Sequence, residues 1–359
     1  MELIEVPWDF IGNERAVAAL DRALREGRPA HAYLFAGPER VGKGALALKL
    51  AQALNCTGDT AHGEPARPEP SRRVEPCGAC QPCRRIAAGL HADVQTVTVE
   101  PSGEGPQHKA IGVGQIREVE RAVILSPFEG RSRVVIFDPA DAMTVEAQNA
   151  FLKTLEEPPP QVAFVLIATR EERLLPTIRS RCRRVELRLL PLAVVEEALL
   201  EVGIEAERAP LLARLSRGRI GWALEMARDP SQLDRRREAL HFVRALATMT
   251  VAERLKLAER LAVDFRRDRE GALSLLVEWQ GWWRDVLLIQ AGAQDGVANQ
   301  DRLAELGQDA QRCARAGVLA FLRALLAARR HLEENIQPRL ALEVVLLEAP
   351  EAAITAHLP

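Results

Sequence analysis

The sequence has no apolar run long enough to span a membrane. Its acidic first ten residues, MELIEVPWDF, have none of the features of a signal peptide. We therefore expect a cytoplasmic protein with no membrane-embedded part. The formal net charge is only −2, which excludes a general attraction to nucleic acid, so any contact with DNA must be local. The sequence also contains no internal repeat.

The length of 359 residues predicts two or three domains, each able to bury a core. Up to about residue 190, short apolar runs alternate with amphipathic segments. Continuous apolar runs are typical of parallel strands that helices cover on both faces, so we expect a doubly wound α/β domain over residues 1–190. The expected strands are 32–36, 94–99, 134–138 and 164–169, and the expected helices are 14–25, 44–55, 115–125 and 142–155.

The remainder of the chain shows only helical periodicity. Pro191 and Pro230 mark plausible boundaries, which predict a small helical lid over 191–230 and a larger helical domain over 231–349. Residues 350–359 are expected to form a tail. Residues 57–76 are rich in proline, glycine and charge without an apolar period, so we expect them to form a mobile loop.

Gly37 to Gly44 reads GPERVGKG and fits the phosphate-loop pattern GxxxxGK, directly after an expected strand and at the start of an expected helix. In such a loop, backbone N–H groups surround phosphate oxygens, and the lysine, here Lys43, reaches the β- and γ-phosphates. Gly37, Gly42, Lys43 and Gly44 are therefore candidate nucleotide-binding residues. The alternative is a plain glycine turn with a solvated lysine.

Two groups that ATP hydrolysis requires are missing from this pattern. Gly44 occupies the position where a Ser or Thr hydroxyl binds Mg²⁺. Asp138 ends an apolar strand where a magnesium-orienting carboxylate belongs, but the next residue, Pro139, has no group that could activate water. We expect Asp141 to cap the following helix. The sequence thus predicts weak or absent Mg²⁺ coordination and very poor hydrolysis, with ATP or ADP binding left open.

Four of the six cysteines fall within one short stretch, Cys56, Cys77, Cys80 and Cys83. Four thiolates match a closed tetrahedral structural zinc site, so we expect a zinc module over residues 56–83. An iron–sulfur cluster is the weaker alternative, since nothing else in the sequence suggests redox chemistry. We expect His62 and His91 to be surface residues.

Several segments resemble the delta-prime family of bacterial DNA polymerase III clamp-loader subunits, which are AAA+ proteins. They are HAYLF before the phosphate loop, the cysteine module after its helix, AQNAFLKTLEEPP at 147–159, LIATR at 166–170 and LLPTIRSRC at 174–182. The resemblance covers residues 1–190 strongly. It continues weakly through WRDVLL at 283–288 and the segment from Asn335 to Glu343.

The resemblance implies an arginine finger at Arg181, within Ser180-Arg181-Cys182, that acts in trans on a neighbouring subunit's ATP. It also implies a sensor position at Thr169, a C-terminal collar domain, and Gly221 where motor subunits have a sensor arginine. Arg219 is a possible substitute for that arginine. From the residues alone, Arg181 is one of several arginines on a solvated rim.

The resemblance further implies a hetero-oligomer with tau/gamma and delta subunits, which reaches the sliding clamp and primed DNA through the complex. The leading interpretation is a scaffold subunit without independent ATPase activity. One alternative is an ATP-hydrolysing motor of the tau/gamma type, against which Gly44 and Pro139 argue. The other is a zinc-containing DNA-binding module, against which the net charge argues.

Overall fold

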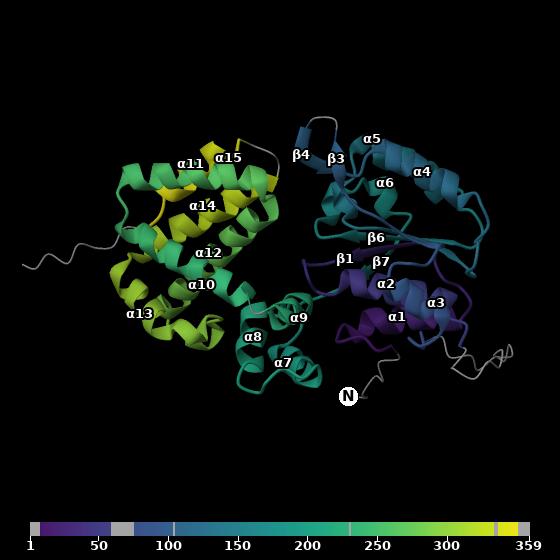
Figure 1. Ribbon diagram of the computed structural model, residues 1–359, viewed down its shortest axis with the longest axis horizontal. Coiled ribbons are helices and arrows are strands. Elements are labelled where there is room, and N and C mark those ends of the chain that lie inside the picture. Colours follow the sequence, from purple (N-terminus) through teal and green to yellow (C-terminus); the bar gives the residue numbers. More distant parts are fainter. Residues whose placement is uncertain (1–7, 59–74, 103–104, 230, 334–336, 351–359) are drawn as a thin grey trace, which may run out of the picture. The chain divides into compact units, whose positions relative to one another are not determined.

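The computed structural model describes residues 8–58, 75–102, 105–229, 231–333 and 337–350 (Figure 1). The chain divides into two compact units. The first consists of Met1–Val195 with Gly218–Trp222, and the second of Glu196–Arg217 with Ala223–Pro359. Among the residues described, none of the helices combines the length and apolarity that crossing a membrane requires.

A five-stranded parallel sheet forms the centre of the first unit, in the order β2-β5-β6-β1-β7. Its strands are β1 (Ala32–Ala36), β2 (Val94–Val97), β5 (Arg133–Phe137), β6 (Val162–Ala168) and β7 (Arg183–Glu186). Every residue of β1 and β6 is buried, as the continuous apolar runs of these strands predict. A separate antiparallel pair is formed by β3 (Glu100–Ser102) and β4 (Gly105–Ala110).

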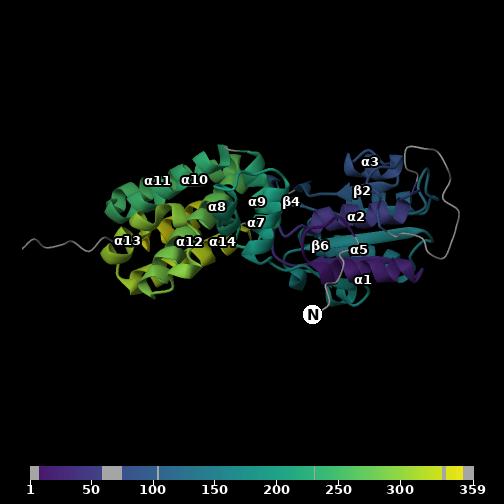
Figure 2. The same cartoon turned by 90° about the horizontal axis from the view of Figure 1, so that it is seen from below.

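Helices cover both faces of this sheet (Figures 1 and 2). One face packs on α1 (Glu14–Arg25), α2 (Lys43–Asn55) and α3 (Gln81–Ala87), and the other on α4 (Val113–Val123), α5 (Val145–Glu156) and α6 (Pro176–Arg179). Each face has its own apolar core. Phe137, Phe151 and Phe164 meet edge to face in one core, with ring centroids 5.0 and 5.1 Å apart. The predicted doubly wound α/β architecture is confirmed for this unit.

Two features of the first unit differ from the expectation. No strand was expected between the strand 94–99 and the helix 115–125, but this segment contains the β3–β4 pair. β7 was not expected, because its residues Arg183, Arg184, Val185 and Glu186 are mostly charged. It lies at the edge of the sheet, where only Val185 is buried. An edge strand carries little of the apolar pattern by which buried strands are recognised.

In the described part of the second unit, helices are the only regular secondary structure. Its helices include α8 (Ala209–Ser216), α10 (Ser231–Ala245), α11 (Val251–Arg267), α12 (Arg269–Gln290), α13 (Leu303–Arg312), α14 (Arg315–Glu333) and α15 (Pro338–Leu347). Both α7 (Leu192–Glu201) and α9 (Ile220–Arg228) contribute residues to the two units. The domain boundaries at 191 and 230 stay predictions.

Three tryptophans of α12 form the centre of the helical core. Trp279, Trp282 and Trp283 are fully buried. The indole N–H of Trp279 donates to Ala239 O at 3.0 Å, and that of Trp282 donates to Asp309 Oδ2 at 3.0 Å. The spacing of these tryptophans along one helix predicts a packing role, and their burial confirms it.

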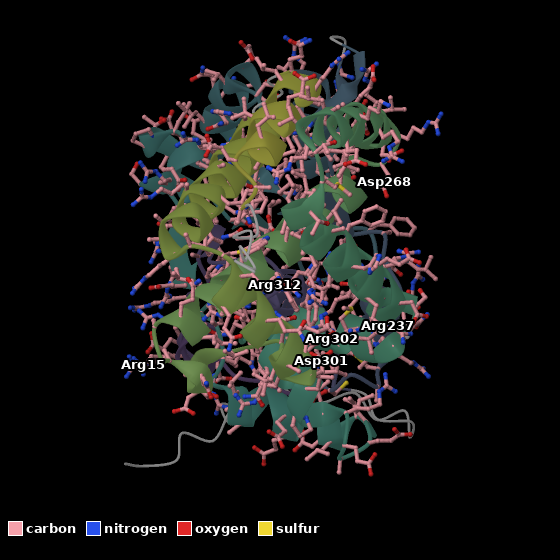
Figure 3. The ribbon with its side chains drawn as sticks, turned by 90° about the vertical axis from the view of Figure 1, so that its left-hand side faces the viewer. Arg15, Arg237, Asp268, Asp301, Arg302 and Arg312 are labelled. Carbon is pink, nitrogen blue, oxygen red and sulfur yellow. The ribbon has the colours of Figure 1, made fainter. Side chains whose placement is uncertain are left out.

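The surface position expected for His91 is wrong. His91 is buried, with its Nδ1 accepting a hydrogen bond from the Asp93 amide at 3.2 Å. His62 lies outside the described residues, as do residues 59–74 of the expected loop. Arg236 lies in the middle of an Arg-Arg-Arg run of α10 in which Arg235 and Arg237 are exposed. Its guanidinium is instead buried against Asp301, which Figure 3 labels, with N–O distances of 2.9 and 3.0 Å. Burial of an arginine depends on a partner distant in sequence, which periodicity does not reveal.

Candidate nucleotide and cysteine sites

The candidate nucleotide-binding residues meet at one edge of the sheet. Lys43 follows β1, Asp138 follows β5 and Thr169 follows β6, and these three strands are neighbours. Because parallel strands end at the same edge, their following residues converge where α/β proteins bind ligands. Gly42 takes the left-handed conformation, with φ of 97°, and begins α2. Gly37 approaches the sheet so closely that a Cβ there would lie 2.1 Å from Leu187 O.

The Lys43 ammonium group forms three hydrogen bonds, two of them to the phosphate loop itself. Its Nζ donates to Gly37 O at 2.6 Å, to Pro38 O at 2.7 Å and to Thr169 Oγ1 at 3.2 Å. These three bonds use all three donors of an ammonium. Burial lowers the pKa of Lys43, whereas the nearby charge of Asp141 is the largest effect that raises it. A bound phosphate would have to replace these internal acceptors.

The position of the missing hydroxyl can be located. A Cβ added at Gly44 would lie 3.6 Å from Asp138 Oδ2, an ordinary contact distance. A Ser or Thr there would therefore bring its hydroxyl next to the carboxylate, which is the pairing that holds Mg²⁺ in hydrolysing P-loops. Burial raises the pKa of Asp138, and the charge of Lys43 opposes that shift. Of the two groups in that pairing, the sequence supplies the carboxylate of Asp138 and not the hydroxyl.

The role expected for Asp141 is wrong. The cap of α5 is Thr144, whose hydroxyl accepts a hydrogen bond from the Ala147 amide at 3.1 Å. Asp141 Oδ2 instead accepts from the backbone amides of Thr169, at 3.3 Å, and Arg170, at 2.8 Å. One carboxylate oxygen of Asp141 therefore fixes the turn after β6, which is a structural role.

Gly221, in α9, lies directly against the phosphate loop. Its amide donates to Arg40 O at 2.8 Å, and a Cβ on Gly221 would lie 2.8 Å from the same oxygen. A side chain at this position would therefore have to displace the loop backbone. The sequence shows that an arginine is absent at residue 221. It gives no signal of this backbone contact, because the contact joins residues far apart in the chain.

The four expected zinc ligands come together. Their sulfur atoms all lie within 4.8 Å of one another, and Cys56 Sγ and Cys80 Sγ are 3.9 Å apart. Cys56 directly follows α2, while Cys80 precedes α3 and Cys83 lies in its first turn. α2 and α3 are also tied together by the Gln52 side chain, which donates to Cys83 O at 2.8 Å.

This arrangement fits a tetrahedral metal ion. Zinc–sulfur bonds of about 2.3 Å place the sulfurs of a tetrahedron about 3.8 Å apart. Backbone amides already point at two of the sulfurs, from Cys77 to Cys56 Sγ at 3.5 Å and from Cys80 to Cys77 Sγ at 3.3 Å. The hydrogen bond from the Cys83 thiol lowers the pKa of Cys56 to about 4. The same hydrogen bond raises the pKa of Cys83, so a thiolate is favoured at Cys56 but not at all four cysteines. Thiolate is the form in which cysteine binds zinc.

Arg181 lies between α6 and β7. Its NH1 donates to Thr177 O at 3.0 Å, and its NH2 donates to Glu156 Oε1 at 2.7 Å. Its side chain is 36% exposed. Arg181 is therefore partly open to solvent and bonded to its own unit, and none of its hydrogen bonds goes to the phosphate loop.

Comparisons with known proteins agree with this architecture. Residues 12–191 match a family model described as DNA polymerase III, delta subunit, and residues 268–350 match one described as its C terminal part. The delta' subunit of Bacillus subtilis is 28% identical over 339 residues, covering 94% of this chain and 96% of that protein. A Pseudomonas aeruginosa delta' subunit is 40% identical over 153 residues, covering 43% and 42%.

A gamma/tau subunit of Mycobacterium bovis is 30% identical over 366 residues. The match covers 94% of this chain but only 59% of that longer protein. The parallel sheet with a phosphate loop at its carboxyl edge defines a P-loop α/β protein. More specifically, the chain belongs to the DNA polymerase III delta-subunit family, among the clamp-loader subunits.

Proposed function

We propose that this chain is a delta-prime-like clamp-loader subunit that does not hydrolyse ATP. In this role it is a scaffold of the DNA polymerase III holoenzyme that supplies Arg181 to the ATP site of a neighbouring subunit. Its partners are then tau/gamma and delta subunits, and the complex loads a sliding clamp onto primed DNA.

One observation carries the non-hydrolysing part of the proposal. The place of the metal-binding hydroxyl is present beside Asp138, but Gly44 leaves it without an oxygen. Pro139 removes the water-activating group from the same site, and the nearby Asp141 is occupied by two backbone amides. Gly221, whose amide bonds to Arg40 O, also has no side chain that could act as a sensor arginine.

Two observations support the role in trans. Arg181 is partly exposed on the first unit, and its planar guanidinium suits the charge of a γ-phosphate. The chain also matches nearly the whole length of the Bacillus subtilis delta' subunit but only part of a gamma/tau subunit. A scaffold that positions a neighbour's ATP requires no catalytic group in its own phosphate loop.

The cysteine cluster has a structural role in this proposal. Zinc held by Cys56, Cys77, Cys80 and Cys83 would fix the start of α3 against the end of α2. Four sulfur ligands leave no open coordination position for catalysis. The phosphate loop retains backbone amides and Lys43, so binding of ATP or ADP without Mg²⁺ remains part of the proposal.

The test is ATP hydrolysis by the isolated full chain and its Gly44→Thr variant. We expect both to be inactive, because Gly44→Thr restores a magnesium ligand but Pro139 still cannot activate water. Gly44→Thr should nevertheless strengthen the dependence of ATP binding on Mg²⁺, measured by calorimetry. A magnesium-dependent turnover of about 1 s⁻¹ or more by the unmodified chain would refute the proposal and favour a tau/gamma-type motor.

A further inference from the structure

The guanidinium of Arg181 is held by two acceptors that belong to two different helices. Glu156 is the last residue of α5, and its Oε1 accepts from Arg181 NH2 at 2.7 Å. Thr177 lies in α6, and its carbonyl accepts from Arg181 NH1 at 3.0 Å. A guanidinium has five N–H donors in a rigid plane, so these two bonds fix the plane and leave three donors for another acceptor.

The contact is specific to Arg181. Among the described residues, Glu156 forms an ion pair with Arg181 alone, whereas the nearby Arg184 pairs with Glu171 and Glu186. The side chain of the adjacent Glu157 makes no hydrogen bond or ion pair within the described part of the chain. The two neighbouring carboxylates therefore differ in whether they touch Arg181.

The contact contributes little to the stability of the fold. The side chains of Arg181 and Glu156 are 36% and 51% exposed, and ion pairs that water screens in this way are weak. Its larger physical effect is on orientation, because a long arginine side chain without partners samples many rotamers. If the guanidinium is already held in one orientation, it loses less conformational entropy when it binds the γ-phosphate.

We propose that Glu156 is a positioning residue for Arg181. Its carboxylate, together with the Thr177 carbonyl, holds the guanidinium in one plane so that the remaining donors are ready for the neighbour's γ-phosphate. This inference rests on the proposed function of Arg181 in trans. The opposite effect, in which Glu156 restrains Arg181 from reaching the phosphate, is an outcome that the experiment distinguishes.

The experiment measures steady-state ATP hydrolysis by the complex reconstituted from the full chain and its motor and delta partners. The variants are Glu156→Ala, Glu156→Gln, Arg181→Ala and the double variant Glu156→Ala/Arg181→Ala. Glu157→Ala is the matched control, since it removes an adjacent carboxylate without touching Arg181. Zinc content and assembly by gel filtration verify that each variant folds and enters the complex.

Glu156→Ala should lower kcat about 3- to 10-fold, because the guanidinium of Arg181 is then less often oriented for the γ-phosphate. The KM for ATP should not change, because Glu156 does not bind ATP. Glu156→Gln retains an acceptor oxygen and should recover at least about half of the rate. Glu157→Ala should stay within about 2-fold of the unmodified complex. The double variant should match Arg181→Ala, since Glu156 has no effect without its arginine.

Three results would overturn the inference while leaving Arg181 its role. They are a Glu156→Ala rate equal to that of Glu157→Ala, a Glu156→Ala rate above that of the unmodified complex, and a further loss when Glu156→Ala is added to Arg181→Ala. A normal rate for Arg181→Ala is a different outcome. It would refute the proposed function of Arg181 and the inference with it.

Discussion

Gly221→Ala tests how tightly α9 approaches the phosphate loop. The added methyl would lie 2.8 Å from Arg40 O, a backbone atom that cannot move aside as a flexible side chain can. Overpacking of this kind costs about 1–3 kcal/mol. Alanine recovers about 0.5–1 kcal/mol over glycine in a helix. We therefore expect Gly221→Ala to destabilise the contact between residue 221 and Arg40 by about 1 kcal/mol.

A matched control is available in the same unit. Gly114 is the second residue of α4, as Gly221 is of α9, but no atom within 4 Å would meet its added Cβ. Gly114→Ala should therefore stabilise the protein by about 0.5–1 kcal/mol. The two substitutions are chemically identical and are expected to act in opposite directions.

The assay is native-state hydrogen exchange followed by mass spectrometry on peptides that cover residues 37–44. A loss of about 1 kcal/mol corresponds to roughly fivefold faster exchange through local opening. Gly221→Ala should show this acceleration, and Gly114→Ala should not. Unchanged or slower exchange of the phosphate loop in Gly221→Ala would refute the argument that backbone contact excludes a side chain at this position.

The remaining predictions concern the metal and a buried carboxylate. The purified chain should contain one zinc per molecule. Cys77→Ser should lose this zinc, whereas Cys182→Ser, which lies outside the cluster, should retain it. Metal analysis that finds no zinc in freshly purified protein would contradict the prediction. Chelators should remove zinc more readily as pH falls, because protons compete for the thiolates. Burial raises the pKa of Asp93, but hydrogen bonds from the amides of residues 128–130 and from Arg133 lower it to about 2. Its contribution to stability is therefore present above the ordinary carboxyl pKa of about 3.9 and is lost as pH falls toward 2. Asp93→Asn should cost about 2 kcal/mol in urea unfolding at pH 7 and less at pH 3, and equal midpoints at pH 7 would contradict this.

The sequence predicts the buried strands of the first unit because their apolar runs are continuous. β1 is found over the expected residues, while β5 and β6 begin one or two residues before the expected starts. The charged edge strand β7 and the β3–β4 pair were missed, because neither has that pattern. A continuous apolar run indicates a strand that is buried on both faces of a sheet. Edge strands lack such a run because they are stabilised mainly by pairing with a neighbouring strand.

For the candidate sites, motif spacing predicts which residues converge but not what each of them contacts. The four cysteines come together through local turns and helix ends, whereas Lys43 meets Thr169 because neighbouring parallel strands end at the same edge of the sheet. Asp141 was assigned to a helix cap, and its actual partners, the amides after β6, are brought near only by the sheet. The contact of Arg181 with Glu156 likewise joins the end of α5 to the distant segment between α6 and β7.

The central claim is that Arg181 acts on a neighbouring subunit's ATP. The direct measurement is ATP turnover and clamp loading on primed DNA by the reconstituted complex that contains Arg181→Ala, with the exposed Arg183→Ala as control. We expect Arg181→Ala complexes to assemble normally and to load clamps about tenfold or more slowly, with little rescue by Arg181→Lys, because an ammonium lacks the planar fork. Arg183→Ala should load clamps at the normal rate. Arg181→Ala complexes that assemble, hydrolyse ATP and load clamps at the unmodified rate would contradict the account.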